Sequence, residues 1–385
     1  IMEKIMEPYQ YPIVRDFMAF VMRPEVAFDE ITTSGEIFQH REFSALIDFC
    51  CKNPEVAEIV VGEVIRRLPE MDVFKACVAA LCVGSITEGG VPCPSSVEIV
   101  NYFIERSWRC VAYLKKAAGM LEVGLDELEP EALEKADQRA LYALDGEGYK
   151  TFVGSYYLIM CVMSRICRER SLRESLRQVE NIEDLCGFLA QYVGAYGFVS
   201  SVLELVEEED IIILSPEQGV GLEVTVRQLD SNFLFFTLFQ IEMYHRGWLE
   251  KLGVLDYKYD PVRDQRAHNL VGEDEREEGQ DSACMEYYTY KAYQPDGTYS
   301  ILMTGADGKQ QVNPENRVWG EGNIYEIPRL DDRIVILVDS HPLMSRSWGK
   351  GFTTPVHGAI RPDVTLKRQL SDDEFDTWMQ KVKNN

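Results

Sequence analysis

The sequence predicts an α+β protein: an all-helical N-terminal domain, residues 1–206, is followed by a mixed α/β domain with a largely antiparallel sheet, residues 207–385. Two observations support this prediction. Apolar residues before about position 206 recur at intervals of three and four, which is the period of an amphipathic helix. After that position the interval falls to two, as in a half-buried strand. The length of 385 residues also fits two or three domains.

The helical period of the first domain is clearest in three stretches. Residues 54–68 follow Asn53, a good helix start, and residues 94–111 follow a second break at a proline. Residues 71–83 repeat the apolar pattern between them. Successive helices with short connections predict paired antiparallel hairpins with a faint likeness to HEAT-type repeats, although no repeat of fixed period is present. The uncharged run Cys186–Leu203 predicts one buried core helix, because a membrane span needs about 20 mostly apolar residues.

The second domain is predicted from alternating apolar residues, turn residues and helix caps. Asp230-Ser231-Asn232 supplies cap side chains for a helix over 233–252, and residues 257–283 are expected to form a long polar loop. The other expected elements are strands at 211–214 and 222–226, a hairpin of 287–293 with 299–303, strands at 334–338 and 363–366, and a final helix at 371–382.

The net charge of −25 comes from 64 Asp and Glu against 39 Lys and Arg. It argues against nucleic acid and against an anionic membrane surface as partners, because both are bound through clustered cations. Residues 201–300 hold 21 of the acids and only 8 bases. Runs at 207–210 and 273–278 cause much of this excess and are expected in solvated loops or at helix ends. The alternative is an acidic surface, Glu207, Glu208, Glu209 and Asp210, that docks a basic partner protein.

The chain is predicted to be cytoplasmic and to bind no cofactor or metal. Residues 1–20 contain charged side chains and no apolar core of a signal peptide. Ten cysteines form no C-x-x-C pair and are expected to be reduced and mostly buried. The five histidines are scattered, and no nucleotide-binding, zinc or calcium motif occurs.

Residues 317–351 form the stretch richest in unusual residue types. It contains Trp319-Gly320-Glu321-Gly322 and Arg346-Ser347-Trp348-Gly349-Lys350. A structural interpretation pairs Arg346 with Glu321 and lets the tryptophans close the edge of a small domain. A functional interpretation is a pocket in which Arg346 and Lys350 bind an anionic group, Trp348 stacks on it, and Glu321 or His341 transfers protons.

Several strings in this domain resemble a group of uncharacterised bacterial cytosolic proteins over about residues 208–385. They are Asp230-Ser231-Asn232-Phe233, Trp319-Gly320-Glu321-Gly322, Ile327-Pro328, the strand from Arg333 to Leu337, and Arg346-Ser347-Trp348. The resemblance implies a bacterial origin and no assigned activity.

Two functions follow from the sequence as hypotheses. The first is a non-catalytic protein-binding protein, an adaptor or an immunity protein of antitoxin type, whose partner is another protein with a basic surface. The second is an enzyme or sensor for a small anionic ligand at the Trp319–Lys350 segment.

Overall fold

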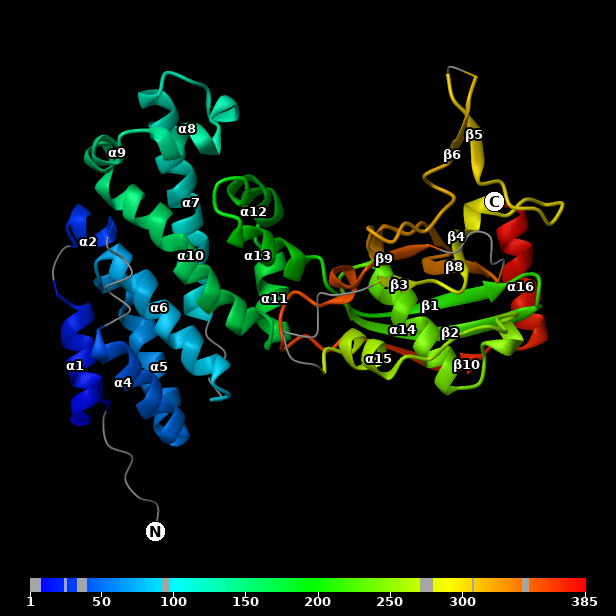
Figure 1. Ribbon diagram of the computed structural model, residues 1–385, viewed down its shortest axis with the longest axis horizontal. Helices are drawn as coiled ribbons and strands as arrows, with labels where there is room; N and C mark the ends of the chain where they lie inside the picture. The colour runs from blue at the N-terminus through cyan, green and yellow to red at the C-terminus, as the bar shows by residue number, and fades with distance from the viewer. Residues whose placement is uncertain are drawn as a thin grey trace, which may run out of the picture. The chain divides into compact units, whose positions relative to one another are not determined.

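The computed structural model of the protein describes residues 8–23, 26–32, 40–91, 97–270, 280–306, 308–340 and 346–385 (Figure 1). The chain divides into two compact units, Ile1–Leu203 and Glu204–Asn385. The first unit is helical and the second is built on a mixed, mostly antiparallel sheet, which confirms the predicted fold class.

Several helices of the first unit begin where the sequence offers a capping side chain or a proline. Asp72 accepts a hydrogen bond from the N–H of Phe74, and Asp145 accepts one from Gly148 at 3.0 Å. The described helices are α1 (Pro12–Val21), α2 (Phe28–Thr32), α4 (Arg41–Lys52), α5 (Pro54–Arg67), α6 (Val73–Glu88), α7 (Val97–Met120), α8 (Pro130–Lys135), α9 (Gln138–Leu144), α10 (Gly146–Ile166), α11 (Arg170–Arg177), α12 (Ile182–Ala190) and α13 (Ala195–Leu203).

Helices α6 and α10 pack closely along their length (Figure 1). A β-carbon on Gly84 would lie 2.9 Å from Cα of Cys161, and one on Gly154 would lie 2.9 Å from Sγ of Cys77. Both contacts join residues 77 positions apart, so the two helices run parallel. The prediction of antiparallel hairpins concerned successive helices with short connections, so this pair, which α7, α8 and α9 separate along the chain, does not test it.

The uncharged run Cys186–Leu203 belongs to two helices, and the prediction of one core helix is wrong. Helix α12 ends at Ala190 and α13 begins at Ala195. The chain turns between them at residues 191–194, which include Gly194, a residue that weakens a continuous helix.

The main sheet of the second unit has the strand order β10-β2-β1-β8-β4, with β7 also pairing with β8. Among the strands that the structure describes in this sheet, only β1 and β8 pair in parallel, and the other pairs are antiparallel. The bounds are β1 (Val206–Ser215), β2 (Val220–Leu229), β4 (Glu286–Thr289), β7 (Arg329–Leu330), β8 (Arg333–Asp339) and β10 (Asp363–Gln369).

Alternate residues of the sheet enter two separate cores. Ile211 and Ile213 lie in a cluster with the apolar side chains of α14 (Asn232–His245). Ile212 and Leu214 lie in another cluster with Met379 of α16 (Asp372–Lys383). Because successive side chains of a strand point to opposite faces, the two helices cover opposite faces of the sheet.

Two of the smaller elements correct the sequence prediction. The expected hairpin of 287–293 with 299–303 is wrong: β4 pairs with β8, while β5 (Leu302–Thr304) pairs with β6 (Gln310–Val312). Strand β4 is buried along its whole length, so its pairing with β8 in the sheet outweighs a local hairpin. Figure 1 shows β5 and β6 as a ribbon that extends away from the sheet.

The expected loop at 257–283 contains α15 (Pro261–Ala267) and β3 (Gln280–Ser282), which pairs with β9 (Ser347–Gly349).

The acidic run at 207–210 lies in the first half of β1 and not in a loop. The prediction of a solvated loop is therefore wrong for this run. Hydrogen bonding to β2, together with the apolar residues from Ile211 onward, extends the strand through these charged positions. The second run, 273–278, lies outside the described residues.

Candidate functional site

The start of helix α14 is bound to the turn at Trp319–Gly322. The backbone N–H of Asn232 donates to the carbonyl of Gly322 at 2.8 Å, and that of Phe233 donates to Gly320 at 2.9 Å. The Asn232 side-chain amide donates to the carbonyl of Trp319, also at 2.8 Å. The turn thus accepts hydrogen bonds from N–H groups that a helix leaves without internal partners.

An aromatic cluster lies directly behind this turn. Phe233 stacks on Trp348 with ring centroids 4.7 Å apart, and a β-carbon on Gly320 would overlap the Phe233 ring. The guanidinium of Arg346 lies 5.4 Å from the centroid of the Trp319 ring and 5.9 Å from that of Phe233. The segments that contain Trp319 and Trp348 are far apart in the sequence, and they pack together here with the start of α14.

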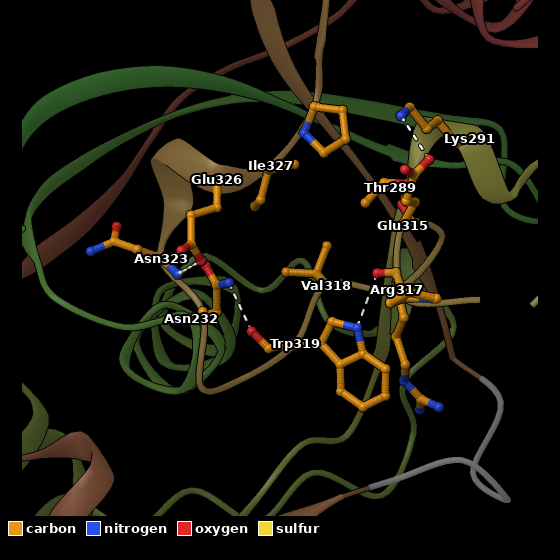
Figure 2. Close-up of a pocket in the computed structure, with 13 residues that line it drawn as sticks. Asn232, Thr289, Lys291, Glu315, Arg317, Val318, Trp319, Asn323, Glu326 and Ile327 are labelled. Carbon is orange, nitrogen blue, oxygen red and sulfur yellow. Dashed lines mark hydrogen bonds and ion pairs between the residues drawn. The ribbon is translucent and has the colours of Figure 1, made fainter. Parts of the chain in front are cut away.

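A pocket of about 360 Å³ opens on the other side of the turn (Figure 2). Val318, Trp319, Ile327 and Pro328 contribute apolar surface. Figure 2 shows Asn232 and Glu326 on one wall and Thr289, Lys291 and Glu315 on the opposite wall. The volume lies within the range of about 300–1,000 Å³ typical of small-ligand sites.

The charged side chains around the pocket differ in whether an ion pair balances their charge. Lys291 forms an ion pair with Glu315 at 3.0 Å. Arg317 forms one with the buried Glu286, whose pKa is raised by burial although Arg317 opposes the rise. The exposed Glu326 accepts a hydrogen bond from the backbone N–H of Asn323 at 2.8 Å, and we find no ion pair for it among the described residues.

None of the candidate residues of the Trp319–Lys350 segment that the structure describes lines this pocket. Arg346 forms the expected ion pair with Glu321, with 3.5 Å between Nη2 and Oε1. Trp348 is only 4% exposed and is covered by Phe233, so a ligand has no open ring face to stack on. Lys350 is half-buried, and its backbone carbonyl accepts a hydrogen bond from Thr353. His341 lies outside the described residues.

The proposed acidic docking residues are engaged in ion pairs across the sheet. Glu208 pairs with Arg227 at 2.8 Å and Glu209 with Arg329 at 3.0 Å. The carboxylate of Asp210 lies 2.7 Å from Nζ of Lys367, and this hydrogen bond is the main cause that lowers the pKa of Asp210. Glu207 also has an interaction partner. These contacts reduce the negative charge that the strand presents, and docking of a basic partner there stays an untested prediction.

A carboxylate just before α14 has a shifted pKa. Burial raises the pKa of Asp230 to about 6, although hydrogen bonds from Ser231 and the backbone of Val356 oppose the rise. The backbone carbonyl of Asp230 accepts a hydrogen bond from the Asn323 amide at 3.2 Å. The residue therefore links the end of β2 to the wall of the pocket.

A second polar cluster lies at the other end of α14, and the sequence analysis missed it. The Asp264 carboxylate is 2.9 Å from Nε2 of His245, 2.8 Å from Nδ1 of His268 and 2.6 Å from the Tyr259 hydroxyl. Burial would raise the pKa of Asp264, but these hydrogen bonds lower it below its usual value. The i,i+4 spacing of Asp264 and His268 is the one signal that could have indicated part of the cluster.

Among the residues that the structure describes, no group of three or more His, Cys, Asp or Glu is placed to hold a metal ion. No described helix is long and apolar enough to cross a membrane.

Comparisons of the chain with protein-family models, curated proteins and solved structures found no match in any of the three. The resemblance to uncharacterised bacterial proteins therefore stays an expectation. Function must be inferred from the geometry of the site.

Proposed function

We propose that the protein is a non-catalytic binding protein and that the pocket beside α14 receives part of a partner protein. The observation that carries this proposal is the side chain of Asn232. It is only 2% exposed and lines the pocket, yet its Oδ1 has no hydrogen-bond partner among the residues that the structure describes. A buried acceptor without a donor is unfavourable, so a bound ligand that supplies the donor would gain affinity.

The construction of the wall also supports binding. The helix start, the turn and the aromatic cluster hold Asn232 and Trp319 in place through hydrogen bonds and close packing. A preformed wall loses little conformational entropy when a ligand binds, which favours affinity. The overall charge of −25 would attract a basic partner and raise its rate of encounter.

The test is a binding screen on the full chain with labelled isoleucine methyl groups. Ile327 lines the pocket, while Ile211 in the sheet core is an internal reference. We expect short capped peptides of at least one charge class to shift the Ile327 signal and leave Ile211 unchanged.

Two variants decide whether such shifts report on the pocket. Pro314→Trp fills the pocket from an exposed lining position and keeps the carbonyl that accepts from the Trp319 indole. Leu255→Trp adds the same bulk at a position that is 80% exposed and does not line the pocket. Binding should disappear in the first variant only. If no peptide class shifts Ile327, or if Pro314→Trp still binds, the proposal is wrong.

A further inference from the structure

The pocket beside α14 offers acceptors in fixed positions. The Asn232 amide donates through Nδ2 to the carbonyl of Trp319, which fixes the orientation of the group and leaves Oδ1 as the unused acceptor. A β-carbon on Gly322 would lie 2.8 Å from Oε2 of Glu326 and 3.3 Å from Nδ2 of Asn232. The carboxylate and the amide are therefore close neighbours on the same wall, as Figure 2 also shows.

The donors around the pocket already have acceptors. The Trp319 indole donates to the carbonyl of Pro314 at 3.0 Å, and the Thr289 hydroxyl donates to the carbonyl of Glu315 at 2.6 Å. Lys291 is bound to the Glu315 carboxylate, and Arg317 to Glu286. An anionic ligand would have to compete with these contacts, whereas a ligand rich in N–H groups meets the exposed carboxylate of Glu326, next to the buried Oδ1 of Asn232.

The pocket also has surface for an alkyl chain and a flat cation. Val318 and Ile327 are buried apolar side chains, and the Trp319 ring already holds one guanidinium, that of Arg346, at 5.4 Å. A planar guanidinium presents several N–H donors in a rigid fork and stacks on aromatic rings, while an ammonium is a compact point charge that keeps its water more strongly.

We propose that the pocket binds the guanidinium of an arginine side chain, with Glu326 and Asn232 as its acceptors and the apolar residues around its stem. This inference rests on the proposed function, because it names the group of the partner protein that enters the pocket. The ligand must carry both a positive charge and N–H donors. A neutral group of the same shape must therefore bind more weakly.

The experiment uses the full chain, the Ile327 methyl signal and four probes of defined chemistry. They are capped arginine, capped citrulline as its neutral isostere, capped glutamate, and free L-arginine. We expect capped arginine to bind at least about tenfold more tightly than capped citrulline, because a charge-assisted hydrogen bond is roughly twice as strong as a neutral one. Stronger binding of the capped than of the free form would identify a protein side chain as the source; the reverse would identify the free amino acid.

A matched pair of variants tests the role of Glu326. Glu326→Gln keeps the shape of the side chain and should weaken capped arginine to the level of citrulline. Glu250→Gln changes an exposed carboxylate that lies in neither the pocket nor the Trp319–Gly322 turn, so it should leave binding unchanged. Equal binding of arginine and citrulline, preference for glutamate, or an unaffected Glu326→Gln variant would overturn the inference. If Pro314→Trp still removes binding in any of those cases, the inference about arginine is wrong but the proposed function stands.

Discussion

The ring of Phe233 occupies the space that any side chain at position 320 would need, since a β-carbon on Gly320 would overlap three of its atoms. We expect Gly320→Ala to destabilise the second unit by about 3 kcal/mol, which is at the upper end for overpacking of a core. Tryptophan fluorescence during urea unfolding can measure this, because four of the five tryptophans, all except Trp108, lie in that unit. Adding Phe233→Leu should recover part of the loss, whereas additive effects would show that the two positions do not compete for space.

Asp230 makes the stability of the second unit depend on pH. Its pKa is raised to about 6 by burial, so between about pH 4 and pH 6 the folded protein holds a proton that the unfolded chain has released. The favourable contribution is complete below about pH 4 and falls as the pH rises through 6, by about 3 kcal/mol in total. We expect Asp230→Asn to become increasingly more stable than the wild type between about pH 4 and pH 6 and the difference to level off above about pH 7, as measured by urea unfolding. The exposed Asp256→Asn should show no such trend, and parallel curves for Asp230→Asn and the wild type would contradict the prediction.

The close parallel packing of α6 and α10 predicts opposite effects of one substitution at two glycines. Gly84→Ala places a methyl group 2.9 Å from the α10 backbone at Cys161. We expect a net loss of about 1–2 kcal/mol, because overpacking outweighs the gain in helix propensity. Gly62→Ala in α5 has nothing within 4 Å and should stabilise the helix by about 0.5–1 kcal/mol. Helical circular dichroism during denaturation measures both, and a stabilised Gly84→Ala variant would argue against the close contact.

A buried ion pair joins α15 to β3. Arg266 and Asp281 lie 2.5 Å apart with side chains 0% and 3% exposed, and Thr353 also donates to the carboxylate. We expect Asp281→Asn to cost about 3–5 kcal/mol, because it leaves a buried guanidinium without a counter-charge. The same substitution at Asp331, in an exposed pair with Lys381, should cost less than about 1 kcal/mol. Equal losses from the two variants, measured by urea unfolding, would show that burial of the first pair adds nothing.

The sequence predicts well those features that depend on neighbours along the chain. The strand predicted from the apolar run at 211–214, the strand predicted from the two-residue period at 222–226 and the cap at Ser231 are all present, since these patterns act over a few positions. The prediction of a hairpin after Tyr287 is wrong although its turn exists: Gly297 has φ of +89° and Tyr293 bridges Tyr299. The better partner for β4 is β8, more than forty residues further along the chain, and no local pattern reveals that pairing.

By itself the sequence determined the change from helices to strands near residue 206 and most of the main strands after it, and it offered the pairing of Arg346 with Glu321 as one of two interpretations. Only the tertiary structure decided that Arg346 and Trp348 support a wall from behind and that Asn232 and Glu326 form the pocket face. The physical reason is that a pocket depends on which atoms remain without partners after all long-range contacts are made. Asn232 Oδ1 remains without a partner because the amide uses its Nδ2 on Trp319, 87 residues away in the chain.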